Sequence, residues 1–142
     1  MKRLLIIFAG LALVASLAAG GFAATTKAPK SSTIMIRHQT RGCHSWSVNG
    51  SAYRATLSTS LARGGAITFM NMDVMPHKLV KTSGPAIHFA GKPNMNHMNA
   101  SVKVTFSKAG TYRLTTKPGE DYMKGMKTIG EDNVLHLTVK VV

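Results

Sequence analysis

GAITFMNMDVMPHKLV, residues 65–80, is the stretch on which the fold of this chain depends. Its first half alternates apolar residues with others, which is typical of a half-buried β-strand. Asn and Asp side chains bond to nearby backbone, so Asn71 and Asp73 predict a turn after this strand. Pro76 then stiffens the approach to His77, and an apolar strand resumes. The pattern predicts either a turn histidine without a ligand or an imidazole presented to a metal between two strands.

The rest of the chain alternates between short predicted strands and turns, at the spacing of a β-sandwich. The predicted strands are residues 33–40, 53–57, 65–72, 77–82, 101–106, 111–116 and 134–142. Residues 41–46 are expected to be a turn or irregular, 83–100 and 117–133 to be long loops, and 101–106 to form a hairpin with 111–116. No segment after residue 23 has a helical period. The predicted fold is all-β, a single Greek-key β-sandwich.

The N-terminal segment has the features of an export signal. Lys2 and Arg3 precede about fourteen apolar residues, which are too few for a membrane span, and small residues follow up to Ala24. We expect residues 1–23 to be a signal peptide, 24–32 a flexible tether and 33–142 the folded domain. The protein is then periplasmic or secreted and has no stable membrane insertion after cleavage. An uncleaved N-terminal anchor is the alternative.

The chain is strongly basic, with 18 Lys and Arg against 5 Asp and Glu. Such a charge favours encounter with an acidic protein or an anionic surface, and a soluble basic surface without a dedicated ligand is the alternative. The basic residues are scattered singly and are not interleaved with aromatic residues. This pattern argues against a nucleic-acid partner.

Two stretches resemble the cupredoxins, the small blue-copper β-sandwich family. The first is Gly-x-Ile-x-Phe-x-Asn-x-Asp followed by Pro-His-x-Leu-Val, within residues 65–80. The second, VKVTFSKAGTYRLTT at residues 102–116, is similar to the family's Phe, short turn and Gly-Thr-Tyr strand pair. The resemblance implies a cupredoxin-like fold, a copper cofactor, His77 as the first copper ligand, and electron transfer or copper shuttling.

The remaining ligands of the family are incomplete in this sequence. Thr116 stands where the family has its copper cysteine, and Glu120 stands close to the place of the second histidine. The segment from Met123 to Gly125 resembles the family's Met-x-Gly motif, which implies that Met123 is a weak axial ligand. The usual blue-copper ligand set is therefore absent from its usual position.

The only cysteine of the chain offers a relocated site. Cys43 cannot form a disulfide within the chain, and His44 follows it directly. Thiolate and imidazole are preferred ligands of copper and zinc. We therefore predict a copper site formed by Cys43, His44, His77 and Met123.

Two alternatives to this ligand set remain open. Adjacent residues of a strand point to opposite faces, so Cys43 and His44 can both bind only if the segment is turned or bulged, as Gly42 allows. In a straight segment, His38 is the better partner for Cys43. In a degenerate cupredoxin without metal, Cys43 and Trp46 pack in the core instead.

Methionine is frequent in the chain, and one cluster lies in a predicted polar loop. Met95, His97 and Met98 are flanked by asparagines there, which makes core filling a poor explanation. Thioethers and imidazole form a soft ligand set for Cu(I), so these residues are secondary copper candidates. They support a second function, a Cu(I) carrier or chaperone, and a third is a metal-free interaction domain. No arrangement of acidic or nucleophilic residues indicates an enzyme.

Overall fold

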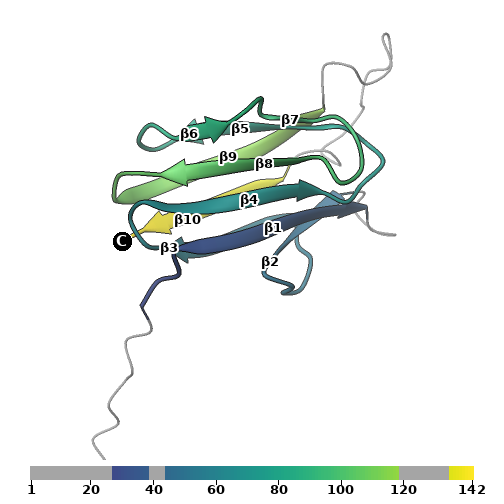
Figure 1. The fold of residues 1–142 in the computed structure, drawn as a ribbon. Coiled ribbons are helices and arrows are strands. Elements are labelled where there is room, and N and C mark those ends of the chain that lie inside the picture. The colour runs from purple at the N-terminus through teal and green to yellow at the C-terminus, as the bar shows by residue number, and fades with distance from the viewer. Residues whose placement is uncertain (1–26, 39–43, 119–134) are drawn as a thin grey trace, which may run out of the picture.

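Two mixed β-sheets face each other in the computed structural model, which describes residues 27–38, 44–118 and 135–142 (Figure 1). One sheet has the strand order β2-β1-β4-β8-β6, with β1 (Ser31–His38), β2 (His44–Val48), β4 (Gly65–Asn71), β6 (His88–Ala90) and β8 (Ser101–Phe106). The other has the order β3-β10-β9-β5-β7, with β3 (Thr56–Leu61), β5 (His77–Ser83), β7 (Asn94–Met95), β9 (Gly110–Pro118) and β10 (His136–Val141). Strands alone make up the regular structure of the described residues, and the predicted all-β sandwich is confirmed.

The core lies between the sheets and follows from the alternation of apolar residues. In β4, Ile67 and Phe69 are fully buried, while the residues between them are half-buried. Trp46 on β2 is also fully buried, with its ring centroid 6.5 Å from that of Phe69. Each such large apolar side chain stabilises the fold by about 1.5–3 kcal/mol when buried. Trp46 is therefore a core residue.

The predicted hairpin between residues 101–106 and 111–116 is wrong. β8 pairs with β4 and β6 in one sheet, whereas β9 pairs with β10 and β5 in the other. The chain crosses the sandwich here because Phe106 and Tyr112 both point into the core, where their rings meet edge-on at 4.9 Å. The Tyr112 hydroxyl donates to the Lys108 carbonyl oxygen at 2.6 Å and fixes the crossing.

Several strand boundaries differ from the prediction. Residues 41–46 were expected to be irregular, but His44–Val48 forms β2, which pairs with β1. The strand expected at 53–57 lies at Thr56–Leu61, where Ser and Thr occupy the exposed positions. The loop expected at 83–100 contains the short strands β6 and β7. β6 forms backbone hydrogen bonds with the longer strand β8, and β7 with the longer strand β5.

The segment expected to be a flexible tether joins the sandwich before residue 33. β1 begins at Ser31, two residues early, because it pairs in parallel with β4 from that point. The carbonyl oxygens of Pro29 and Lys30 accept hydrogen bonds from the backbone N–H groups of Ala62 and Ala66. The predicted signal peptide, residues 1–23, lies outside the described residues. Among those described, no helix is long and apolar enough to cross a membrane.

One end of the sandwich collects the segments on which the candidate site depends. β1 and β4 run parallel, so His38 and Asn71 both lie at this end, and Met72 N–H donates to the Ile36 carbonyl oxygen at 2.8 Å. The chain then passes to the other sheet, where β5 begins at His77. We call this the His77 end; it comprises His38, residues 71–77 and residues 94–100 (Figure 1).

Candidate metal centre

Asn71 holds the His77 end together. Its side chain is fully buried, and Nδ2 donates to the carbonyl oxygens of Met75 at 2.7 Å and Met95 at 3.1 Å. Its Oδ1 accepts from the N–H of Asp73 at 2.9 Å, and Asp73 Oδ1 accepts in turn from the N–H of Met75 at 3.1 Å. These local bonds form the turn that Asn and Asp favour. They fix the path of the chain into His77.

His77 is buried at the first position of β5. Its side chain is 2% exposed, and Nε2 lies 3.6 Å from Oδ2 of Asp73, whose side chain is fully buried. This contact is longer than a hydrogen bond, so Asp73 is a close polar neighbour of the imidazole. From the sequence, Asp73 was predicted only as a turn residue. Its place beside His77 follows from the turn that brings residues 73 and 77 together.

Met95 lies directly opposite His77. The two residues are Cα partners in the antiparallel pair of β5 and β7, and both are buried. Directly opposed residues of such a pair point to the same face, with their Cβ atoms about 5 Å apart. An imidazole and a thioether are therefore neighbours in the interior of the His77 end. From the sequence, the two residues were predicted to belong to two different sites, and the structure brings them together.

Thr116 occupies an inward position close to His77. It is fully buried on β9, where it pairs with Leu79, while His77 pairs with Pro118 two residues further along β9. Alternation along the strands places Thr116 and His77 on the same face of the sheet. The hydroxyl of Thr116 thus stands on the side of the sheet that the imidazole faces.

The predicted relocated site is only partly within the described residues. Cys43 and Met123 lie outside them, so their approach to His77 stays a prediction. His44 begins β2 and is the Cα partner of His38, the last residue of β1. His38 is exposed at the same end of the sandwich as His77.

The secondary candidates His97 and Met98 lie on the surface of the same end. Both are exposed, and Nδ1 of His97 lies 2.9 Å from the carbonyl oxygen of Met98. The segment is anchored there because Asn99 N–H donates to the Asn71 carbonyl oxygen at 2.6 Å. Within residues 27–38, 44–118 and 135–142, no three His, Cys, Asp or Glu side chains are grouped so as to hold a metal ion.

Comparison with known proteins gives similar folds at low identity. No protein-family model and no curated protein sequence matches the chain. A purple cupredoxin from Nitrosopumilus maritimus is 18% identical, with a TM-score of 0.42, over 76% of this chain and 98% of that one. Amicyanin from Paracoccus versutus is 17% identical, with a TM-score of 0.44, over 78% and 81%. The inclusion body protein PixA from Burkholderia cenocepacia is 10% identical, with a TM-score of 0.44, over 83% and 97%.

These similarities concern the fold. Cupredoxins are among the solved structures to which this chain is similar. The identities are too low to carry a ligand, a partner or an activity to this chain. What the site can bind has to be argued from its own residues.

The described donors fit one oxidation state of copper better than the other. The buried pair of His77 and Met95 offers imidazole nitrogen and thioether sulfur, which are ligands that suit Cu(I). The thiolate on which a blue-copper centre depends could come only from Cys43, which lies outside the described residues. The described residues therefore fit Cu(I) and do not by themselves provide a blue-copper ligand set.

Proposed function

We propose that this chain is an exported, cupredoxin-like protein that binds copper as Cu(I) and shuttles it, with His77 and Met95 as ligands. One observation supports the proposal above the others: a buried imidazole and a buried thioether oppose each other across β5 and β7. When bound, copper would supply a single soft cation that such donors retain. Export rests on the basic and apolar N-terminal sequence, which is typical of a signal peptide.

The surroundings of the pair support a role in copper transfer. Asn71 fixes the backbone on both sides of it through the carbonyl oxygens of Met75 and Met95. Preorganised ligands bind a metal without a large ordering cost. On the surface of the same end, Met98 is 46% exposed and His97 precedes it. These two side chains provide outer donors between solvent and the buried pair.

Electron transfer through the relocated site is the second candidate. The observation that favours it is the pairing of His38 with His44 at the His77 end, because Cys43 directly precedes His44 in the sequence. A site of Cys43, His44, His77 and Met123 would add a thiolate to the imidazole already buried there. A thiolate ligand to Cu(II) gives a visible charge-transfer band, which Cys43→Ser would remove.

Competition between the purified protein and a coloured Cu(I) chelator, without oxygen, tests the first candidate. We expect Met95→Leu to lower the Cu(I) affinity by at least about tenfold, because it removes the sulfur but nearly conserves the volume. The matched control is Met35→Leu on β1, a half-buried methionine whose neighbours Ile34 and Ile36 take the core positions. It should leave the affinity unchanged.

Two results would contradict the proposal. Equal Cu(I) affinities of Met95→Leu and Met35→Leu would show that the buried thioether is not a ligand. A loss of affinity in Cys43→Ser larger than that in Met95→Leu, together with a visible Cu(II) band in the unmodified protein, would favour the relocated electron-transfer site. X-ray absorption of the Cu(I) form provides an independent readout through the number of sulfur ligands.

A further inference from the structure

The outer face of the second sheet presents a regular grid of hydroxyl and basic side chains. Across β3, β10 and β9, Ser58 is paired with Thr138 and Thr138 with Arg113. In the next row, Ser60 is paired with Lys140 and Lys140 with Thr111. We call these six residues the hydroxyl face.

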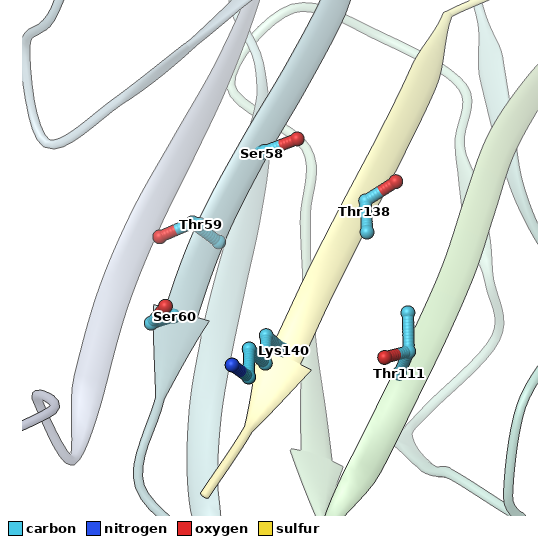
Figure 2. Close-up of a pocket in the computed structure, with 6 residues that line it drawn as sticks. All are labelled: Ser58, Thr59, Ser60, Thr111, Thr138 and Lys140. Atoms are coloured by element: carbon cyan, nitrogen blue, oxygen red, sulfur yellow. The ribbon is translucent and has the colours of Figure 1, made fainter.

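The hydroxyl face points to solvent because the alternate residues of the same strands fill the core. Leu57, Leu114 and Leu137 are buried, whereas Ser58, Ser60, Thr111, Arg113 and Lys140 are exposed and Thr138 is half-buried. A shallow hollow of about 450 Å³ lies over the three strands (Figure 2), lined by Ser58, Thr59, Ser60, Thr111, Thr138 and Lys140. A ligand can therefore contact three strands at once.

The charged side chains of the hydroxyl face itself, Arg113 and Lys140, are both basic. The full chain carries a formal net charge of +13, and Lys78 and Lys117 form a cross-strand pair in the same sheet. Arg113 and Lys140 are diagonal neighbours, about 7–8 Å apart. The field over the face therefore attracts an anion that carries repeated charges.

We propose that the hydroxyl face docks an acidic polysaccharide. Carboxylate or sulfate groups of the polymer pair with Arg113 and Lys140, and its sugar hydroxyls exchange hydrogen bonds with Ser58, Ser60 and Thr138. Ser and Thr hydroxyls both donate and accept, so they suit a ligand whose own groups are hydroxyls. Charge complementarity and this hydroxyl chemistry together identify the occupant.

The composition of the face argues against other macromolecules. Stable protein interfaces are anchored by buried aromatic and apolar side chains, and single-stranded nucleic acids stack on aromatic rings. The hydroxyl face consists of Ser, Thr, Lys and Arg and so has neither feature. Insertion into a membrane requires exposed apolar side chains. Of the large ones that are most exposed among the described residues, Val74 and Met98 lie at the His77 end, and Val142 alone adjoins this face, next to Lys140.

Binding of the mature chain to polygalacturonate, measured by calorimetry at low ionic strength, tests the proposal. We expect binding to the polymer but not to neutral dextran, and weakening as the ionic strength rises from about 0.01 M to about 1 M. Arg113→Gln with Lys140→Gln should weaken the affinity by about tenfold. Thr138→Val, which keeps the charge, should weaken it by about threefold through the lost hydroxyl.

The matched control removes the same charge from residues outside the hydroxyl face. Lys92→Gln with Lys103→Gln changes two exposed basic residues, one of them on β8 of the first sheet. An affinity loss equal to that of the Arg113 and Lys140 pair would overturn the proposal in favour of a general charge effect. Equally tight binding of polyglutamate, abolished by the same pair, would overturn it in favour of an acidic protein as the partner.

Discussion

The two ends of the sandwich are fixed by different means. At the His77 end, one buried amide, Asn71, connects two loops through side-chain hydrogen bonds. At the opposite end, backbone turns depend on glycines: Gly64, Gly84 and Gly110 all have positive φ. A glycine turn has no side chain at its central residue to position. The loops bonded to the Asn71 amide, in contrast, hold His77, Met75 and Met95 in fixed positions. The comparison indicates how the His77 end can keep an imidazole and a thioether together.

Loss of the buried amide should have the largest effect. Asn71→Ala removes bonds to Met75, Met95 and Asp73 and leaves buried carbonyl oxygens unsatisfied. We expect the free energy of unfolding to fall by about 3 kcal/mol, measured by urea denaturation. Cu(I) affinity of the folded protein should fall as well, because the carbonyl that positions Met95 loses its donor. A variant with unchanged stability would show that the loops hold each other without Asn71.

At the opposite end, Gly84→Ala should destabilise the fold but spare the metal site. A Cβ at Gly84 would lie 2.6 Å from the Thr111 carbonyl oxygen, and φ is +100°. We expect a loss of about 2 kcal/mol in the free energy of unfolding. Gly64→Ala is the matched control, because a Cβ there meets nothing within 4 Å and only the positive φ is strained. An altered Cu(I) affinity in folded Gly84→Ala would contradict the independence of the two ends.

The crossing between the sheets should show a smaller effect. Tyr112→Phe keeps the edge-on contact with Phe106 but removes the hydrogen bond to the Lys108 carbonyl oxygen. We expect the free energy of unfolding to fall by about 1 kcal/mol, measured by the same urea titration. A fall much larger than this would mean that the bond determines which sheet β9 joins.

The smallest change in stability is expected for Thr116→Cys. The side chains are similar in size, so the free energy of unfolding should change by less than about 1 kcal/mol. The substitution places a thiol on the face of the sheet that His77 shares. We expect a visible Cu(II) charge-transfer band that Cys43→Ser does not abolish. Absence of the band would show that the His77 end cannot bring a thiolate from β9 to the imidazole.

The salt dependence of the association rate tests the basic surface independently of the two ends of the sandwich. If the basic surface attracts an acidic redox or copper-donor protein, association should slow steeply as ionic strength rises. Stopped-flow measurements with such a protein test this expectation. A rate independent of salt would indicate a soluble basic surface without a steering role.

Sequence patterns predicted the strands better than their partners. Alternation in residues 65–80 located β4, the turn and β5, because each strand buries one face and exposes the other. The same alternation cannot show which sheet a strand joins, so β8 and β9 were wrongly paired. β2 was not predicted, because the segment that includes Cys43 and His44 was interpreted as a turn that presents metal ligands. Its formation depends on long-range pairing with β1.

The residues of the candidate site could be named from the sequence, but their proximity could not. His77 was predicted as a ligand from its position after Pro76 and Met95 as a secondary copper candidate, and both side chains are buried. Met95 lies opposite His77 because of the register between β5 and the two-residue strand β7. No local sequence pattern shows this register. Asn71 was recognised as a turn residue, but its bonds to Met95 join segments 24 residues apart. Such a contact is set by the assembled sandwich.

The direction of β1 determines how the molecule would be oriented on a support. β1 runs from Ser31 to His38, and its last residue lies at the His77 end. Eight residues of strand span about 25 Å, so the point where the preceding chain joins the sandwich is separated from that end by nearly the length of a strand. A membrane or larger assembly that held residues before Lys27 would therefore be attached to the end of the sandwich opposite the His77 end. The His77 end, with Met98 on its surface, would then face away from that support, toward molecules that diffuse in solution.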